Sequence, residues 1–400
     1  MDVIDTIYLD DNQVRSTIVW DLGRRCNYDC TYCTGWMHST TAPFNKLEQY
    51  KKTAAFINEY YEIYGMFSNL DFRPAISFTG GEPTINPDFF PLVDYMRETY
   101  PHIPLSVTTN GTWGHERCKK LAATMKNITI SYHAEGSDKQ KELFKKNVLW
   151  LKANYPKPIR INVMMHVDHW DECVALIEDF LKPNGVNYIP RVIGDDGMKK
   201  SEWFEDIDGA MRRTTHVYNA EQLDWMKKHW KKKNDEVGDT KTKITSEVKA
   251  PQDMGRMCCG GRCMKVKDKG ETRDTMFIPQ TNFEGWKCLI NWFFLHIEED
   301  KDAIYHHQTC MARFPEYENA PNQVKFTQYN FPPERGPICS ISNCDDYLNW
   351  LENRMMTKTL PVITCPNTFC GCGICVPKSN NQADFDEILK KYTTIEDISA

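Results

Sequence analysis

The sequence lacks an excess of positive charge, a basic amino-terminus and any long apolar run. Its 400 residues carry a formal net charge of −6, so no overall basic field attracts nucleic acid or an anionic membrane. The segment from Met1 to Asp11 contains four aspartates and no basic residue, which argues against a signal or transit peptide, and no apolar stretch approaches the length of a membrane span. We therefore expect a cytoplasmic protein that binds neither nucleic acid nor membrane.

Cysteine, by contrast, is abundant. The chain has 16 cysteines, with 41% hydrophobic and 12% aromatic residues, enough apolar material for one large core and a smaller domain. Without an export signal, metal ligation in a reducing compartment explains these cysteines better than disulfides do.

Three of the cysteines form a compact group, Cys26, Cys30 and Cys33, spaced Cys-x3-Cys-x2-Cys directly after a strand-like run. Thiolates at such gaps can turn toward one metal centre, and they favour iron–sulfur clusters, zinc or cuprous copper. A closed zinc site needs four ligands, and the next candidate, His38, falls outside the usual spacing. The pattern indicates an open three-cysteine site, with a zinc knuckle or a chance grouping as the alternative.

This loop resembles the signature of the radical S-adenosylmethionine (SAM) superfamily, including the aromatic Tyr32 before the third cysteine. The resemblance implies a four-iron, four-sulfur (4Fe-4S) cluster on Cys26, Cys30 and Cys33, whose free iron binds the cofactor SAM. It also implies reductive cleavage of SAM to a 5′-deoxyadenosyl radical that abstracts a substrate hydrogen. The electron would come from a one-electron donor such as flavodoxin or ferredoxin.

Residues 15 to 193 alternate short apolar runs with longer amphipathic ones, which predicts parallel strands joined by crossover helices. The predicted strands are Thr17 to Leu22, Ala75 to Phe78, Leu105 to Thr108, Ile128 to Tyr132, Ile161 to Met165 and Asn187 to Val192. The predicted helices are Leu47 to Met66, Asp88 to Thr99, Asp138 to Asn154 and Trp170 to Phe180. The pattern predicts an α/β fold, a partial (β/α)6 TIM-like barrel with its site at the strand C-termini, and the family resemblance independently implies the same barrel.

Two turns after predicted strands resemble cofactor-binding motifs of the family. Gly80, Gly81, Glu82 and Pro83 resemble its GGEP turn, and the family implies that this turn binds the methionine amino group of SAM. Thr109 and Asn110 resemble its TNG turn, where short polar groups can contact a ribose or carboxylate. Taken alone, each could be an ordinary turn.

Other candidates lie near the ends of later strands. Ser131 and His133 could contact cofactor or substrate, and His133 is our candidate acid–base group, although a lone histidine is more often structural. Arg191 could pair with the cofactor carboxylate, or could form a surface ion pair. Tyr32 completes the set of cofactor-binding candidates.

Eleven cysteines crowd the region after Met257. Between Cys288 and Cys310, apolar runs flank the acidic turn Glu298 to Asp302 and predict a hairpin resembling a SPASM or twitch domain, an extension that carries auxiliary 4Fe-4S clusters in radical enzymes. Its spacing departs from the family pattern, and a structural zinc site is the alternative. The candidate auxiliary ligands are Cys288, Cys310, Cys339, Cys344, Cys365, Cys370, Cys372 and Cys375, followed by Cys259 and Cys263.

The sequence predicts three parts: a barrel over 1–200, a charged helical connection over 201–256, and a small cysteine-rich auxiliary domain over 257–400. Auxiliary clusters near a substrate favour oxidative modification of a peptide or protein side chain. Against this, fewer than twenty residues precede the first predicted strand, and we expect no peptide-recognition domain there. Radical modification of a small molecule or nucleotide-derived substrate is the second interpretation, and a non-enzymatic zinc-binding interaction module is the third.

Overall fold

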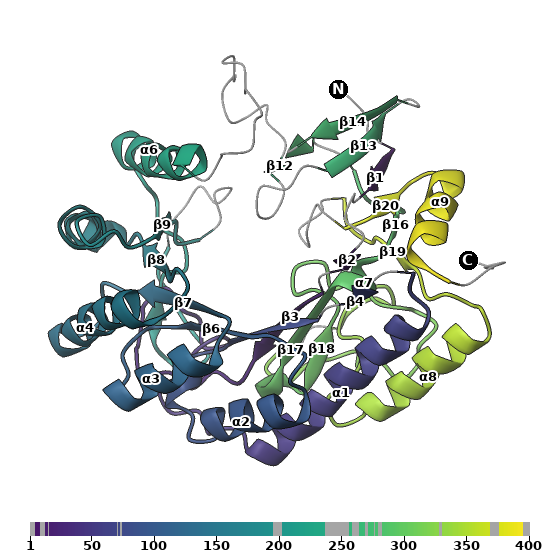
Figure 1. Ribbon diagram of the computed structural model, residues 1–400, viewed down its shortest axis with the longest axis horizontal. Coiled ribbons are helices and arrows are strands. Elements are labelled where there is room, and N and C mark those ends of the chain that lie inside the picture. The colour runs from purple at the N-terminus through teal and green to yellow at the C-terminus, as the bar shows by residue number, and fades with distance from the viewer. Residues whose placement is uncertain are drawn as a thin grey trace. The chain divides into compact units, whose positions relative to one another are not determined.

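The computed structural model of the protein describes residues 5–8, 13–14, 16–69, 71–72, 74–194, 202–236, 256–257, 264–268, 271–275, 277–278, 282–327, 330–368 and 376–394 (Figure 1). Its contacts divide the chain into two compact units. Unit 1 contains Met1–Trp20, Glu48–Ile76 and Ser246–Ala400, and unit 2 contains Asp21–Leu47 and Ser77–Thr245. Each unit combines segments that lie far apart in sequence. The division into three consecutive parts stays a prediction.

All six predicted strands are present and follow one another in a single sheet. They are β3 (Thr17–Asp21), β5 (Ala75–Thr79), β6 (Leu105–Thr109), β7 (Asn127–Tyr132), β8 (Arg160–Met164) and β9 (Tyr188–Arg191). The full order of the eight-stranded sheet is β18-β17-β3-β5-β6-β7-β8-β9. Strands β6 to β9 pair in parallel, with Ser106 opposite Asn127 and Ile130 opposite Ile161. The predicted α/β class and its barrel-type strand order are confirmed.

Unit 2 places helices along these parallel strands (Figure 1). They are α2 (Phe89–Thr99), α3 (His115–Thr124), α4 (Asp138–Asn154), α5 (Trp170–Ala175) and α6 (Ala220–Glu236), with the short 3-10 turns η1 (Pro83–Ile85) and η2 (Val167–His169). Helix α4 begins where predicted because Gln140 Oε1 accepts a hydrogen bond from the backbone N–H of Ser137 at 2.9 Å, half of a capping box. The predicted helix from Trp170 to Phe180 is divided, since α5 continues as the π-helix η3 (Leu176–Leu181).

Unit 1 contains the predicted acidic hairpin. Strands β17 (Phe294–Glu298) and β18 (Ala303–Tyr305) pair antiparallel across the turn η4 (Glu299–Lys301), and β17 lies next to β3 in the sheet. A six-stranded sheet has the order β14-β13-β1-β20-β16-β19. Its strands are β1 (Thr6–Tyr8), β13 (Met264–Asp268), β14 (Glu271–Thr275), β16 (Lys287–Cys288), β19 (Ile363–Thr364) and β20 (Lys378–Ser379). The short pairs are β2 (Gln13–Val14) with β4 (Asp71–Phe72) and β12 (Arg256–Met257) with β15 (Phe277–Ile278).

The helices of unit 1 are α1 (Leu47–Met66), α7 (Ile290–Phe293), α8 (Cys344–Met356) and α9 (Gln382–Tyr392). Helix α1 has the predicted bounds because its apolar residues recur at three- and four-residue intervals and form one buried face. Tyr60 and Tyr64 lie on that face. The Tyr60 hydroxyl donates to the Asn291 carbonyl at 2.6 Å, and the Asn291 amide donates to the Tyr64 hydroxyl at 2.8 Å. These bonds satisfy polar groups that would otherwise destabilise an aromatic core.

A buried carboxylate lies at the turn of the acidic hairpin. Glu299 accepts hydrogen bonds from Trp20 Nε1 at 2.8 Å, Thr53 Oγ1 at 2.7 Å and Gln49 Nε2 at 2.6 Å. Burial raises the pKa of Glu299 to about 7 although these bonds oppose the rise. The turn is thereby fixed to β3 and α1 within unit 1.

Among the helices of the described residues, none is both long and apolar enough to cross a membrane.

Candidate functional site

The glycine turn after β5 packs directly against the chain that leads into the cysteine loop. Gly80 has φ +134°, and a Cβ there would lie 2.4 Å from the Gly23 carbonyl oxygen. A Cβ on Gly81 would lie 2.4 Å from the carbonyl oxygens of Arg24 and Arg25. The N–H groups of Gly81 and Glu82 donate to Gly23 and Arg25 at 2.8 Å each. Only residues without a side chain permit this approach, so the two motifs form one backbone assembly.

Glu82 joins this assembly to the turn after β6. Its side chain is 2% exposed and accepts from the Thr84 N–H and hydroxyl, from Thr109 Oγ1 at 2.7 Å and from the Asn110 N–H at 2.6 Å. Burial raises the pKa of Glu82, although these hydrogen bonds act to lower it. The Asn110 side-chain amide in turn donates to Asn27 Oδ1, inside the cysteine loop, at 2.7 Å. The three sequence motifs are therefore linked by hydrogen bonds.

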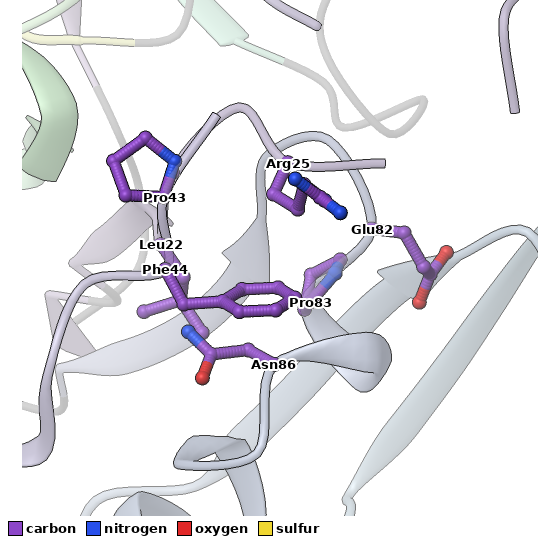
Figure 2. Close-up of a pocket in the computed structure, with 8 residues that line it drawn as sticks. Leu22, Arg25, Pro43, Phe44, Glu82, Pro83 and Asn86 are labelled. Carbon is purple, nitrogen blue, oxygen red and sulfur yellow. The ribbon is translucent and has the colours of Figure 1, made fainter. Parts of the chain in front are cut away.

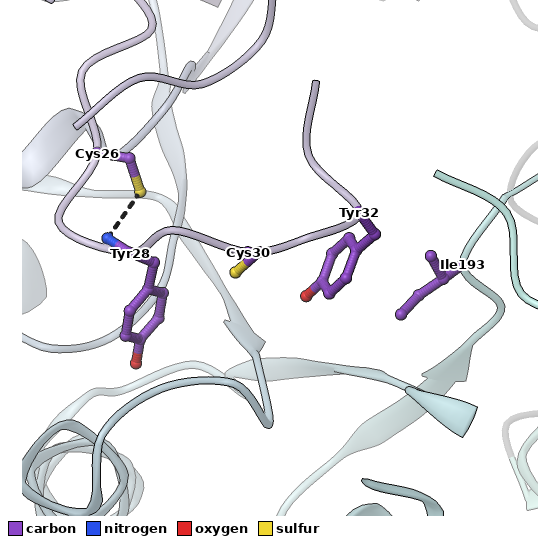
Figure 3. Close-up of a cluster of buried hydrophobic side chains, with 5 residues drawn as sticks. All are labelled: Cys26, Tyr28, Cys30, Tyr32 and Ile193. Atoms are coloured by element: carbon purple, nitrogen blue, oxygen red, sulfur yellow. Dashed lines mark hydrogen bonds between the residues drawn. The ribbon is translucent and has the colours of Figure 1, made fainter. Parts of the chain in front are cut away.

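The cysteine loop follows β3, at the strand end where barrel enzymes carry their sites. Cys26 and Cys30 are buried and Cys33 is partly buried, and none of the three is in a disulfide. Figure 3 shows Cys26 and Cys30 on the loop with Tyr28 and Tyr32, and the Tyr28 N–H lies 3.4 Å from Cys26 Sγ. Burial raises the pKa of Cys26 to about 12 and of Cys33 to about 11, and raises that of Cys30 as well.

These thiols fit a multi-iron cluster. Buried next to one another, they resist deprotonation unless a cation compensates, and a coordinating metal deprotonates a thiol outright. Among the described residues, no three His, Cys, Asp or Glu side chains converge as ligands of a single metal ion. A cluster binds its thiolates at separate irons and does not require such convergence. His38 is not arranged as a fourth ligand, since its Nε2 hydrogen-bonds the Tyr28 carbonyl.

Two charged residues that the sequence reasoning passed over hold the loop. Glu135 accepts from the Thr31 N–H at 2.9 Å and from its hydroxyl at 2.6 Å. Arg212, in the hairpin of β10 (Phe204–Glu205) and β11 (Met211–Arg212), donates to the Cys30 carbonyl at 3.1 Å. Burial raises the pKa of Cys33, and the charge of Arg212 opposes this rise. The dipeptide Asp208-Gly209 is a hairpin signal that could have located β10 and β11.

Histidines surround Tyr32. Its hydroxyl hydrogen-bonds Nδ1 of His133, and its ring centroid lies 5.9 Å from that of His166 and 6.1 Å from that of His216. Burial lowers the pKa of His133 and of His216 to about 4, so both are neutral at pH 7. His133 therefore lies beside the loop as a neutral hydrogen-bonding group.

The remaining candidates are spread along the sheet. Ser131 is a half-buried residue of β7, opposite Asn162 of β8. Arg191 is a half-buried residue of β9, and its Nε lies 3.4 Å from Asn162 Oδ1. Burial lowers the pKa of Arg191. The structure gives neither residue a contact with the three linked motifs among the hydrogen bonds of the described residues.

A small pocket lies behind the glycine turn (Figure 2). Its volume is about 10 Å³, and its lining includes Arg25, Phe44, Glu82 and Pro83. The Arg25 guanidinium lies 5.5 Å from the Phe44 ring centroid, and the Glu82 carboxylate points away from Phe44 and Pro83. Pockets for drug-sized ligands start at about 300 Å³, so this one is too small for a cofactor of nucleoside size.

The described C-terminal cysteines form two groups in unit 1. Cys339 and Cys344 are fully buried. Burial raises the pKa of Cys339, and the neighbouring Cys344 thiolate raises it further. Asn367 Nδ2 donates to the Cys310 carbonyl at 2.9 Å, and Cys365 Sγ lies 3.6 Å from the Asn367 carbonyl. Cys288 is on β16, which pairs with β19 just before Cys365. The candidates Cys259, Cys263, Cys370, Cys372 and Cys375 lie outside the described residues.

Residues 20–162 match the family model described as the radical SAM superfamily. This part of the chain is a radical SAM domain. The family uses S-adenosylmethionine and a 4Fe-4S cluster, and the domain contains all three linked motifs.

Relatives share parts of this chain. GTP 3′,8-cyclase of Paenarthrobacter nicotinovorans is 32% identical over 110 residues, which are 27% of this chain and 28% of that protein. A probable GTP 3′,8-cyclase of Halobacterium salinarum is 28% identical over 204 residues, 46% of this chain and 52% of that protein. The chain thus spans about half the length of these curated relatives or less. Among solved structures, Streptococcus suis SuiB matches 78% of this chain and 63% of its own, at 13% identity and a TM-score of 0.42.

Proposed function

We propose that the protein cleaves S-adenosylmethionine reductively and uses the 5′-deoxyadenosyl radical to abstract a substrate hydrogen. One observation carries this proposal: the cysteine loop, the glycine turn and the Thr109–Asn110 turn are joined by direct hydrogen bonds within unit 2. Motifs that occur by chance over 85 residues are not expected to lie next to one another at one end of a parallel sheet.

In this proposal Cys26, Cys30 and Cys33 hold the cluster. The bound cluster supplies one electron to the sulfonium of SAM, which gives methionine and the radical that takes the substrate hydrogen. The glycine turn would bind the methionine end of the cofactor, as the family resemblance implies. Glu82 keeps the Thr109–Asn110 turn in place, and its Oε2, which accepts one described hydrogen bond, has capacity for a further donor.

For the substrate, our first proposal remains a peptide or protein side chain that undergoes oxidative modification. It rests on the C-terminal cysteines, because an auxiliary 4Fe-4S cluster near a substrate can accept the electron left after hydrogen abstraction. In this proposal the ligands would come from two cysteine groups of the described residues: Cys339 with Cys344, and Cys288 with Cys310 and Cys365. The electron donor would be a flavodoxin or ferredoxin.

A nucleotide is the second candidate substrate. It is favoured by the relatives named GTP 3′,8-cyclase, which match 27% and 46% of this chain. GTP itself is the direct probe. If it increases 5′-deoxyadenosine formation by anaerobic, reduced protein, the nucleotide candidate replaces the peptide candidate, and if it has no effect the peptide candidate stands.

The cleavage activity is tested with Cys30→Ala in reconstituted, reduced protein, measured as 5′-deoxyadenosine released from SAM. We expect the variant to lose cleavage, since its loop keeps only two cluster ligands. Cys118→Ala is the matched control, because Cys118 is a buried cysteine of helix α3, and it should cleave like the wild type. Full activity in Cys30→Ala would show that the loop is not the catalytic site.

Replacing Cys26, Cys30 and Cys33 together by alanine separates the catalytic cluster from auxiliary ones. Iron should fall but remain measurable, and the remaining spectrum should not respond to SAM, because a fully ligated auxiliary cluster has no open iron. A triple variant that binds zinc and no iron would make the C-terminal region a structural zinc site.

A further inference from the structure

The β10–β11 hairpin contacts the cysteine loop at points on both sides of Cys33. Phe204 pairs with Arg212 and Glu205 with Met211, and the turn closes with the Gly209 N–H bonded to the Asp206 carbonyl at 2.8 Å. From this hairpin the Arg213 N–H donates to the Thr31 carbonyl at 2.7 Å. The Asp206 carboxylate accepts from the Gly35 N–H. Residues that follow directly after β10 and β11 therefore hold the backbone on either side of the third cysteine.

Arg212 makes the central contact. Its Nη1 donates to the Cys30 carbonyl at 3.1 Å and to Asp29 Oδ1 at 3.0 Å, and its Nη2 donates to Asp208 Oδ2 at 2.7 Å. The side chain is 2% exposed, so the guanidinium is desolvated. Its Nε lies 4.0 Å from Asp206 Oδ2 and, within the described part of the chain, has no hydrogen-bond partner. Burying a cation with an unsatisfied donor costs folding free energy. We therefore expect Arg212 to serve a function at this position.

Glu135 holds the neighbouring residue from a different element. It binds the N–H and hydroxyl of Thr31, the residue after Cys30. The peptide between Cys30 and Thr31 is thereby fixed by opposite charges, with Arg212 on the Cys30 carbonyl and Glu135 on the Thr31 N–H. Charge-assisted bonds of this kind are roughly twice as strong as neutral ones. The peptide that follows the second cysteine is thus held from both sides.

We infer that Arg212 is a positioning residue that fixes the Cys30 segment for cluster binding and that its buried charge raises the reduction potential of the bound cluster. The second part rests on the proposed function. Reduction adds one negative charge to the cluster, and a nearby cation in a low-dielectric site stabilises that charge more than it would in water. Removing Arg212 takes away this cation and also leaves Asp29, Asp206 and Asp208 without their shared partner, which makes reduction harder still.

Three variants separate position from charge. Arg212→Gln removes both, and Arg212→Lys keeps the charge but loses the planar fork that reaches several acceptors at once. Arg213→Gln is the matched control directly after β11. The Arg213 side chain binds Asp168 and lies 5.0 Å from the Trp203 ring centroid, and its contact with the loop among the described hydrogen bonds is through its backbone N–H.

The first measurement uses cluster-free protein. Hydrogen–deuterium exchange of the peptide covering residues 26–35 should be about tenfold faster in Arg212→Gln and in Arg212→Lys than in the wild type, because a charge-assisted bond is lost. The control should exchange like the wild type. Wild-type exchange in both Arg212 variants would overturn the positioning role.

The second measurement uses reconstituted protein and follows the SAM-responsive signal in a redox titration. The midpoint potential should shift to more negative values in Arg212→Gln and should stay close to the wild-type value in Arg212→Lys and Arg213→Gln. An unchanged midpoint in Arg212→Gln at full iron content would overturn the charge role. If the wild type itself takes up no iron at the loop, the proposed function fails and the charge role with it, whereas the exchange data still decide the positioning role.

Discussion

Glu299 gives a stability prediction whose size and sign follow from its environment. Its pKa in the folded protein is about 7, against 4.5 for the exposed group, because burial disfavours the carboxylate. A raised pKa in an acid means that the folded state holds the proton more tightly than the unfolded state does. The stabilisation is therefore fully present below pH 4.5 and is lost as the pH rises to about 7.

The size of this loss follows from the two pKa values. At about 1.4 kcal/mol for each pKa unit, the change amounts to about 3 kcal/mol, a large fraction of the stability of an ordinary domain. Glu299→Gln removes the titration while keeping an oxygen for Trp20 Nε1 and Thr53 Oγ1, and the Gln49 amide can turn its oxygen toward the new amide group. The free energy of unfolding of wild type relative to Glu299→Gln should therefore fall by about 2–3 kcal/mol between pH 5 and pH 8.

Urea unfolding at several pH values measures this difference, with tryptophan fluorescence as the signal because Trp20 binds Glu299. Glu298→Gln is the matched control in the same hairpin. Burial acts to raise the pKa of Glu298, but His296 and Lys301 lower it overall, so its contribution should be lost as the pH falls. A wild-type minus Glu299→Gln difference that does not change with pH would refute the reasoning.

Two further predictions concern the cofactor turns. Glu82→Gln should leave iron content unchanged but weaken SAM affinity by about tenfold in calorimetry, because the uncharged amide loses the charge-assisted bond that Oε2 would accept from the cofactor amino group, worth about 1.5–3 kcal/mol. Unchanged affinity would limit Glu82 to a structural role. Gly81→Ala should lower the thermal unfolding midpoint, because its Cβ meets two carbonyl oxygens at 2.4 Å, whereas Gly65→Ala, with no atom within 4 Å of the added Cβ, should not lower it. Equal midpoints for these two glycine variants would contradict the close backbone approach at Gly81.

The strands and most helices could be predicted because each depends on a local pattern. Apolar runs predict β3 and β5 to β9, and the recurrence of apolar residues at three- and four-residue intervals predicts α1 and α4 with their observed bounds. Helix α3 was missed because only Cys118 and Leu121 of its ten residues are buried, too few for a clear apolar face. The π-helical continuation of α5 could not be predicted, because a change from α-helical to i→i+5 hydrogen bonds leaves no trace in the spacing of apolar residues.

The parts of the candidate site that are short sequence motifs could be predicted. The parts that depend on contacts between residues far apart in sequence could not. Cysteine spacing and glycine turns are visible in sequence, and the structure places them together. The sequence predicts a charged helical connection over 201–256 and does not reveal the β10–β11 hairpin, since its strands have two residues each and Phe204 and Met211 are exposed. Arg212 could not be linked to Cys30 from sequence, because nothing local couples residues so far apart. The assignments to Cys370, Cys372 and Cys375 stay predictions.

The distance in sequence between Arg212 and Cys30 also has a consequence for how the protein is made. The two residues are 182 positions apart, and ribosomes add about 5–20 residues per second, so about 10–40 s separate their synthesis. During this interval the three thiols have been translated while the guanidinium that holds their loop does not yet exist. The nascent chain cannot form the Arg212 contacts of the loop until β11 has been made, which places the finished cysteine loop late in biogenesis.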